Sequence, residues 1–522
     1  MQELLVKHST EFVNEPFTDF SNSENIEKMS KAIDTVKSWL GKEYPLVING
    51  EKIYTDKKEK SINPADLDQI IGVCQFAEKE HADKAINAAY ETFNTWKKVS
   101  AEERASYLFK VADLIRERKF EFSALLSYEV AKNWAEADAD VAEAIDFLEF
   151  YGREMIRYSQ GHELTPVKGE KNKLEYLPLG VGMVIPPWNF PLAIMAGMTT
   201  ASIVTGNTVV LKPSQDAPVI AAKFFELLEE VNLPKGVVNF LTGDGSVIGD
   251  FMTEHHLTRF IAFTGSMEVG LRINERAAKT QKSQIWIKRV IAEMGGKDAI
   301  VVDNEANLED AVNGIVASAF SFQGQKCSAC SRAIVVDSVY DEVLSKVKEK
   351  TEKLAMGLAT DNAYMGPVSS ERSINKILEY IEIGKKEGKL VTGGERLNDK
   401  NGYFVKPTIF SEISPEARLA QEEIFGPVLA FIRAKDFDDA LRIANNTKFG
   451  LTGAIYTQNE EKLTKGAEEF FVGNLYLNRK CTGALVGGHP FGGFNMSGTD
   501  SKAGGKDYLQ LFMQAKMTTK KI

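Results

Sequence analysis

From residue 179 onward, short β-branched segments alternate with stretches of helical spacing. The segments LGVGMVI, NTVVLKP, GVVNFLTG and TRFIAFTG are separated by stretches such as PLAIMAGMTTASIV and PVIAAKFFELLEEV. This alternation is typical of βαβ units, in which helices bury both faces of a parallel sheet. A second alternating run begins at DAIVV, residues 298–302, and continues through RAIVVD, a helix near 339–355, LTGAIYT and GNLYLN. The sequence therefore predicts an α/β protein with two α/β domains that meet near residue 293.

The length of the chain agrees with more than one domain. Its 522 residues exceed the size at which a single hydrophobic core stops growing. Residues 1–45 are polar and rich in Lys and Glu, which predicts a helical arm or cover. Apolar residues at a spacing of three to four predict amphipathic helices over residues 79–95 and 101–131. No period of 20–50 residues repeats and no segment is of low complexity.

Charge and hydropathy exclude several classes of protein. The net charge is 63 − 73 = −10 with no long basic run, which argues against nucleic acid as a partner. The first fifteen residues, MQELLVKHSTEFVNE, contain no apolar core of a signal peptide. The most apolar stretch is interrupted by three prolines, so we predict no membrane span. Four cysteines are too few for a disulfide framework, which favours a reducing, cytoplasmic setting.

Several of the predicted strands lead into helices through small residues, and ligands of open α/β sheets bind at such strand ends. The spacing G-x-G-x-x-x-G over residues 243–249 is one residue longer than the dinucleotide fingerprint, and a plain tight turn is the alternative. Residues 264–266, Thr-Gly-Ser, precede a helix whose N-terminal amides are suited to a pyrophosphate. Lys212 follows an apolar strand, where it either binds a ligand or is a solvated surface lysine.

The stretch SFQGQKCSACSR places Cys327 and Cys330 three residues apart. A structural zinc site needs two further ligands at a regular spacing, and neither the other cysteines nor His255-His256 supply them. A redox pair remains open, because C-x-x-C before a helix lowers a thiol pKa. The other interpretations are a single nucleophile with a bystander, or two small buried side chains.

Two further segments favour the nucleophile. In AEMGGKDAIVV, Glu293 precedes a Gly-Gly turn, as a partly desolvated general base or as a surface carboxylate. In PPWNFP, Asn189 lies between prolines, a rigid setting for an amide aimed at a developing oxyanion. A thiol, a carboxylate and an amide beside a nucleotide fold suggest oxidation of a carbonyl through a covalent adduct.

Seven motifs between residues 187 and 498 resemble the aldehyde dehydrogenase superfamily in order and spacing. They are PWNFP, LKPS, FTGSxxVG, AEMGGK, GQKC, EEIFGPV and PFGGFNMSG. The interval from Glu293 to Cys327, 327 − 293 = 34, also matches the family. The resemblance extends from about residue 45 to the C-terminus. Three segments, SFQGQKCSACSRAI, NRKCTGALVG and FNMSGTDSKAGGKDYL, resemble the members that oxidise glutamate γ-semialdehyde in proline breakdown.

The resemblance implies a catalytic role for three residues. Cys327 would attack the aldehyde carbon, and Asn189 with the Cys327 amide would hold the oxyanion. Hydride would pass to the nicotinamide of NAD, and Glu293 would activate water to hydrolyse the thioester. Cys330 would be a bystander, and no metal is required.

The resemblance also implies the binding residues. Those expected to contact NAD are Pro187, Trp188, Lys212, Ser214, Gln215, Gly265, Ser266, Glu423 and Phe425. Those expected to contact the substrate are Ser328, the loop residues Gly483 and Ala484, and the aromatic pair Phe190 and Phe491. Gly483-Ala484 as a simple turn is the alternative.

The identity of Gln215 bears on the nucleotide. Strongly NAD-selective members of the family carry an acidic residue three positions after the lysine of KP, which binds the ribose hydroxyls and repels a 2′-phosphate. Gln215 is neutral, which predicts NAD as the working cofactor with measurable use of NADP. Asp216 is an alternative source of the missing charge.

The resemblance predicts an aldehyde dehydrogenase-like fold, with a doubly wound nucleotide-binding domain, a second α/β catalytic domain and a small β oligomerisation element. We expect the NAD-binding domain over 1–158 and 179–293, the catalytic domain over 294–488, and the oligomerisation element over 159–178 and 489–522. Within that element we expect a β-hairpin at 159–178, joined by a tail strand near 508–520, and at least a homodimer.

Two other functions stay open on the sequence. One is an aldehyde dehydrogenase with a different or broad aldehyde substrate, against which Ser328 and the TGA loop argue. The other is a relative without catalysis, which loss of the thiol or carboxylate would mark, and both groups are present.

Overall fold

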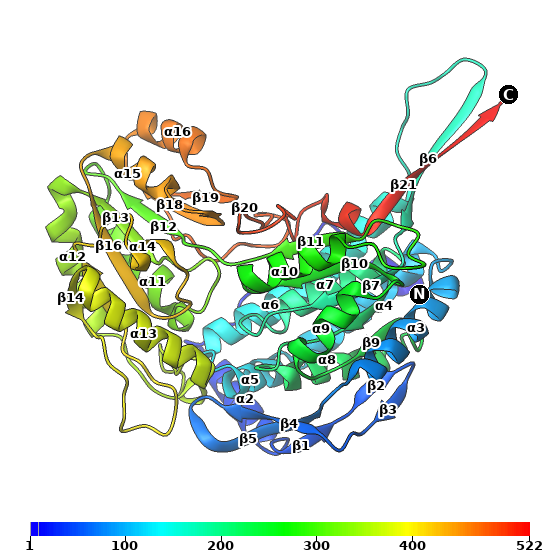
Figure 1. Cartoon of the computed structure of the whole chain (residues 1–522), viewed down its shortest axis with the longest axis horizontal. Helices are drawn as coiled ribbons and strands as arrows, with labels where there is room; N and C mark the ends of the chain where they lie inside the picture. Colours follow the sequence, from blue (N-terminus) through cyan, green and yellow to red (C-terminus); the bar gives the residue numbers. More distant parts are fainter. Residues whose placement is uncertain (1, 9) are drawn as a thin grey trace.

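The computed structural model describes residues 2–8 and 10–522, which form two lobes side by side (Figure 1). One lobe contains most of the chain up to Glu293, and the other contains the chain from Ala299 to Leu477. Each lobe is built around a seven-stranded, mostly parallel sheet. The α/β class predicted from the alternating pattern is confirmed.

The first sheet is doubly wound. Its order is β11-β10-β7-β8-β9-β2-β3, so the chain moves outward from β7 to β9 and then returns to add β10 and β11 on the other side. The five strands from β11 to β9 are parallel, and β2 and β3 are antiparallel additions. A topological switch point therefore lies between β7 and β10, where ligands of open sheets bind. The strands are β2 (Leu46–Ile48), β3 (Glu51–Ile53), β7 (Val181–Ile185), β8 (Thr208–Leu211), β9 (Val238–Phe240), β10 (Thr258–Thr264) and β11 (Arg289–Glu293).

The second sheet has the order β14-β15-β16-β13-β12-β18-β19. Only β14 is antiparallel to its neighbour. Its strands are β12 (Ala299–Val302), β13 (Arg332–Val336), β14 (Lys389–Thr392), β15 (Thr408–Ser411), β16 (Val428–Ala434), β18 (Thr452–Tyr456) and β19 (Asn474–Leu477).

Helices cover the sheets on both faces, which explains why the strands are continuously apolar. In β8, Val209 and Leu211 join one buried cluster, whereas Val210 between them joins another. In β12, Val301 and Val302 likewise belong to separate clusters. Because successive strand residues point to opposite faces, every position of such a strand must be hydrophobic.

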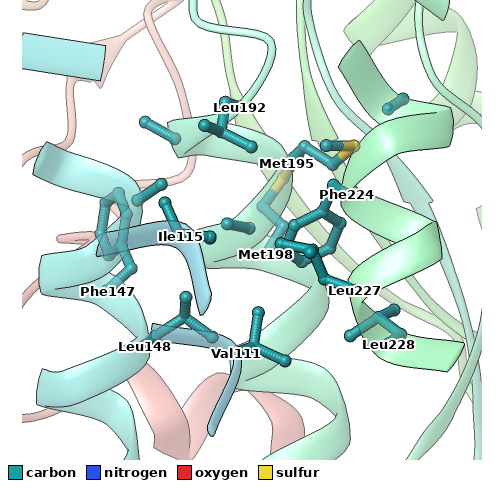
Figure 2. Packing of buried hydrophobic residues seen from close by; sticks show 14 of the residues in the cluster. Val111, Ile115, Phe147, Leu148, Leu192, Met195, Met198, Phe224, Leu227 and Leu228 are labelled. Atoms are coloured by element: carbon teal, nitrogen blue, oxygen red, sulfur yellow. The ribbon is translucent and has the colours of Figure 1, made fainter. Parts of the chain in front are cut away.

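In the first lobe, the largest buried cluster lies between α4, α6, α7 and α8, and Figure 2 shows part of it around Met195 and Phe224. The helices of this lobe are α3 (Lys79–Trp96), α4 (Ala101–Glu117), α5 (Lys119–Glu129), α6 (Trp134–Ser159), α7 (Ala193–Val204), α8 (Pro218–Glu230), α9 (Gly245–Glu254) and α10 (Met267–Ala278). The helix predicted over 101–131 is thus two helices, because Arg118 leaves the helical conformation at φ −108° and ψ 23°.

The second lobe contains a further set of helices. They are α11 (Leu308–Phe320), α12 (Asp337–Glu352), α13 (Glu371–Glu387), α14 (Arg418–Gln421), α15 (Phe437–Asn445) and α16 (Glu460–Glu469), with 3-10 turns η1 (Ser321–Gly324) and η2 (Ala359–Asp361). A two-stranded pair, β17 (Phe449–Gly450) and β20 (Phe494–Asn495), attaches the later chain to this lobe.

The N-terminal region combines helices with a small sheet. Helices α1 (Gln2–Lys7) and α2 (Ser23–Lys37) precede β1 (Lys42–Tyr44). A three-stranded sheet of order β1-β5-β4 follows, with β4 (Lys58–Asn63) and β5 (Asp66–Gln75) antiparallel. In Figure 1 this sheet lies below α5 and α8.

A two-stranded ribbon projects from the lobes at the upper right of Figure 1. It pairs β6 (Glu170–Pro178) antiparallel with β21 (Met513–Lys521), which follows the 3-10 turn η3 (Tyr508–Phe512). The predicted hairpin within residues 159–178 is wrong, since this segment forms a single strand whose partner is the tail strand. A sequence pattern shows strand propensity but not which distant segment provides the hydrogen bonds.

Among the described residues, no helix combines the length and apolar character needed to cross a membrane.

Candidate active site

The segment that carries Cys327 begins with a strained turn. After α11, Phe322, Gln323 and Gly324 take left-handed φ values of 48°, 56° and 66° in succession. Such conformations are unfavourable for residues with a side chain and concentrate at functional sites. A Cβ on Gly324 would lie 2.5 Å from the carbonyl oxygen of Gly426, so only glycine fits there. The turn reverses the chain tightly at the end of α11 and leads directly into the Cys327 segment.

Cys327 is half-buried at the end of this turn. Its carbonyl oxygen approaches Gly296 so closely that a Cβ there would lie only 2.5 Å away. Burial raises the pKa of the Cys327 thiol, and the charges of Asp298, Glu423 and Glu293 raise it further. The thiol is therefore protonated at neutral pH in this state, and its reactivity depends on a change in its electrostatic surroundings.

Asn189 lies beside the nucleophile segment. It is buried in the loop after β7, and its Nδ2 donates to the carbonyl oxygen of Gln325 at 3.1 Å. The Gln325 side chain is itself held, since its Oε1 accepts from the Ser369 backbone N–H at 2.9 Å. The Asn189 amide is thus held against the backbone of Gln325, two residues before Cys327 in the chain.

Glu293 ends β11, and its carboxylate accepts three hydrogen bonds. The Ser501 hydroxyl donates at 2.5 Å, the Ser501 backbone N–H at 3.2 Å and the Gly493 backbone N–H at 3.3 Å. Burial outweighs these contacts and raises the pKa of Glu293 to about 7. A carboxylate that titrates near neutral pH is suited to general-base catalysis. Sequence reasoning missed Ser501, which is 208 residues away in the chain.

The Gly-Gly turn after Glu293 makes room for Glu423. A Cβ on Gly295 would lie 2.2 Å from a Glu423 carboxylate oxygen. The backbone N–H of Gly296 donates to the same carboxylate at 3.0 Å. Burial raises the pKa of Glu423. The Gly-Gly turn of the AEMGGK motif therefore brings Glu423 next to the segment that carries Glu293, and the two carboxylates lie on neighbouring parts of one site.

Aromatic rings surround the loop of Asn189. The Trp188 ring contacts Phe425 edge-on, with centroids 5.5 Å apart. Phe425 itself has a left-handed φ of 63°. Phe491 is half-buried and exchanges backbone hydrogen bonds with Ala503, which brings the chain around Gly493 and Ser501 back to Glu293. Pro187 precedes Trp188 and is half-buried.

A buried lysine contacts two aromatic rings of the site. The Nζ of Lys132 is 3.7 Å from the centroid of the Phe190 ring and 4.7 Å from that of Phe322. It also pairs with Asp140 at 2.9 Å, and neither side chain is exposed. Asp140 in turn accepts from the Ala193 backbone N–H at 2.8 Å. Lys132 thus connects the Asn189 loop to the turn before Cys327, a link that no local motif revealed.

The predicted nucleotide residues lie at the carboxyl ends of β8 and β10. Lys212 is buried, and burial lowers its pKa to about 8. A Cβ on Gly245 would lie 4.0 Å from its Nζ, at ordinary contact distance, and this Nζ donates to the Pro213 carbonyl oxygen at 3.1 Å. Ser266 caps α10 by accepting from the Val269 N–H at 3.4 Å, and the Gly265 N–H donates to the Glu293 carbonyl at 3.1 Å. A buried cation and a capped helix N-terminus near the switch point fit a dinucleotide.

Two further predicted nucleotide residues lie in the loop after Lys212. The Ser214 hydroxyl accepts from the Asp216 N–H at 3.4 Å. The Gln215 amide donates to Glu59 of β4 at 2.9 Å, a contact that the sequence did not suggest.

The loop of Gly483 and Ala484 begins next to the nucleophile segment. The Cys481 thiol donates to the carbonyl oxygen of Ser328 at 3.3 Å. Arg479 donates to the carbonyl oxygens of Thr482 and Gly483 at 3.0 and 2.9 Å, which fixes the loop. Gly483 has a φ of 80° and is exposed. The structure therefore brings Ser328 and this loop together, as the predicted substrate site requires.

Comparisons with known proteins identify the family to which the chain belongs. The chain matches the aldehyde dehydrogenase family over residues 53–518, and it belongs to that family. It is 58% identical over 506 residues to 1-pyrroline-5-carboxylate dehydrogenase of Geobacillus thermodenitrificans (strain NG80-2), covering 97% of this chain and 98% of that one. It is also 58% identical over 509 residues to 1-pyrroline-5-carboxylate dehydrogenase 2 of Bacillus subtilis (strain 168), covering 97% and 99%.

A solved structure has the same fold. The crystal structure of 1-pyrroline-5-carboxylate dehydrogenase from Thermus with bound NAD superposes with a TM-score of 0.97 at 49% identity. The match covers 98% of this chain and 99% of that one.

Proposed function

We propose that the chain oxidises L-glutamate γ-semialdehyde, the open form of 1-pyrroline-5-carboxylate, to L-glutamate with NAD as the hydride acceptor. The observation that carries this proposal is the contact between the Cys481 thiol and the Ser328 carbonyl oxygen at 3.3 Å. This contact supports the proposal, because it joins the start of the Gly483–Ala484 loop to the residue that follows Cys327. The names of the relatives support the same substrate.

Cys327 and Asn189 carry out the first step. The Cys327 thiol first releases its proton to solvent; the thiolate sulfur then forms a bond to the aldehyde carbon, and the carbonyl oxygen becomes an oxyanion in a thiohemiacetal. The Asn189 amide, which is held by the carbonyl oxygen of Gln325, donates to that oxyanion together with the Cys327 backbone N–H. Because both donors are rigid, they stabilise the developing charge without reorganising.

Bound NAD supplies the acceptor for the hydride that leaves the thiohemiacetal carbon. The residues proposed to hold it are Lys212 and Gln215 at the adenosine ribose, Ser266 at the pyrophosphate, and Glu423 at the nicotinamide ribose. The buried ammonium group of Lys212 and the room that Gly295 leaves for the Glu423 carboxylate support this assignment. The thioester that results is still attached to Cys327.

Glu293 completes the cycle by removing a proton from water, which attacks the thioester and releases the Cys327 thiolate and glutamate. With its pKa raised to about 7, Glu293 is a stronger base than an exposed carboxylate while remaining substantially ionised at neutral pH. The three donors from Ser501 and Gly493 hold the carboxylate in place.

The substrate's charged tail fits the Gly483–Ala484 loop. Gly483 has a left-handed φ, and backbone N–H groups in such turns converge on anions. Phe190 and Phe491 wall the aliphatic middle of the substrate, and Ser328 supplies a hydroxyl donor.

The test is NADH formation with glutamate γ-semialdehyde beside propanal and other uncharged aldehydes. We expect kcat/KM for the semialdehyde to exceed that for propanal by at least about 100-fold, since two lost charged contacts are worth roughly 3 kcal/mol. A preference for propanal would instead support the alternative, a broad aldehyde dehydrogenase.

We further propose that the chain works as a cytoplasmic homo-oligomer. The β6–β21 ribbon leaves the backbone groups on both outer edges without a strand partner in the described chain, and such edges pair readily with other strands. Four free cysteines suit a reducing compartment. Light scattering of the purified protein tests the assembly, and a monomer would refute it.

A further inference from the structure

The loop that follows β8 contains a hydrogen bond to a distant strand. Gln215, the neutral residue expected at the adenosine ribose, donates from its Nε2 to an oxygen of Glu59 at 2.9 Å. Glu59 lies in β4, 156 residues earlier in the chain, and is half-buried. The amide that would otherwise be free to donate to a ligand is therefore occupied by a carboxylate.

A set of hydrogen bonds connects β4, the strand of Glu59, to α8. Ser61 lies two residues further along the strand, on the same face as Glu59, and its hydroxyl donates to buried Glu129 at 2.9 Å. Glu129 also accepts from the backbone N–H groups of Val219 and Ile220, at 2.7 and 2.8 Å. These two residues form the first turn of α8, where a carboxylate is favoured by the helix dipole. Glu129 thus ties β4 to the helix that follows the Gln215 loop.

The surroundings of this contact are predominantly acidic. The negative charges of Glu59, Asp244 and Asp216 raise the pKa of Lys212, and the charge of Glu59 has the largest effect of the three. Two other cations lie nearby. The charge of Arg372 lowers the pKa of Asp216, and the charge of Lys57 lowers the pKa of Asp244. Glu59 itself has Gln215 and Lys212 as its favourable partners. The Glu59 carboxylate therefore interacts electrostatically with the Lys212 ammonium group.

We infer that Glu59 is the acidic residue that makes this chain prefer NAD to NADP. The inference rests on the nucleotide site proposed above, and Glu59 supplies from β4 the charge that Gln215 lacks. A carboxylate accepts hydrogen bonds from ribose hydroxyls, whereas a 2′-phosphate carries nearly two negative charges and is repelled. Gln215 alone predicted appreciable use of NADP, and the charge of Glu59 limits that use.

The direct test is binding of each nucleotide without aldehyde, followed by quenching of intrinsic tryptophan fluorescence. For Glu59→Gln, we expect the ratio of Kd for NADP to Kd for NAD to fall by about tenfold or more, because one charge beside a phosphate has an effect of this size. Glu51→Gln on β3 removes the same charge from an exposed side chain paired with Lys84, and it should leave the ratio unchanged. An unchanged ratio in Glu59→Gln, or an equal change in Glu51→Gln, would overturn the inference.

Two further variants separate the charge from the amide that it holds. Glu59→Asp keeps the charge and should keep the preference for NAD. Gln215→Ala removes the amide but leaves Glu59, so it should also keep that preference. If Gln215→Ala relaxed the ratio as far as Glu59→Gln, the amide and not the carboxylate would discriminate.

The same binding measurements distinguish this inference from the proposed function. If wild type binds neither nucleotide, the proposed nucleotide site fails. If both bind with the same ratio in every variant, only the role of Glu59 fails.

Discussion

Replacing Ser501 with alanine removes one of the three hydrogen bonds to Glu293, the short one from the hydroxyl at 2.5 Å. That hydrogen bond lowers the pKa of Glu293, so its loss raises the pKa. A hydrogen bond to a charged group contributes about 1.5 kcal/mol, which corresponds to about one pKa unit. The ionised form is the base, so deacylation slows as pH falls through the pKa. The midpoint near pH 7 in the wild type should therefore move to about pH 8 in Ser501→Ala.

The assay is the pH dependence of kcat under conditions in which deacylation limits turnover. From pH 6 to pH 8 the ionised fraction of the wild-type carboxylate rises from about a tenth to about nine-tenths, and the rate should follow it. In Ser501→Ala the rate at pH 7 should be about a tenth of its plateau at high pH. A plateau close to that of the wild type serves as the internal control for folding. A midpoint that stays in place or moves to lower pH would refute the account of how Glu293 is tuned.

Other variants test the remaining contacts of the site. Cys330→Ala should keep most activity and Cys327→Ala none, because Cys330 is buried and its thiol donates to the Arg332 carbonyl; equal losses would favour a redox pair. Lys132→Met should destabilise the fold by about 3–5 kcal/mol in denaturant unfolding, by leaving Asp140 unpaired, and a stability within about 1 kcal/mol of wild type would contradict this. Ala484→Leu should raise KM for the semialdehyde while sparing propanal, and equal slowing of both would count against the anchor loop.

The architecture was predictable because its signals are local. Strands such as β8 and β12 are apolar at every position, and turns and helical spacing flank them within a few residues. Cys327, Glu293 and Asn189 could be proposed as candidates, since each lies in a short motif that resembles the aldehyde dehydrogenase family. The helix break at Arg118 could not be predicted, because the helical spacing of apolar residues continues through the residue at which α4 ends.

The partners of the site residues were not predictable in the same way. Ser501 reaches Glu293 across 208 residues, and Glu59 reaches Gln215 across 156. Neither pair leaves a periodic pattern, because each depends on how separate elements pack. The hairpin expected within residues 159–178 does not form, because β6 pairs with β21, which lies where the tail strand was expected.

The central claim is that Cys327 carries the substrate through a thioester that Glu293 hydrolyses. Glu293→Gln should therefore form about one NADH per active site in a rapid burst and then stall, since only the activation of water is lost. Mass spectrometry of the stalled protein should find one γ-glutamyl group on the peptide that contains Cys327. Steady turnover without a burst, or a modified residue other than Cys327, would contradict the mechanism.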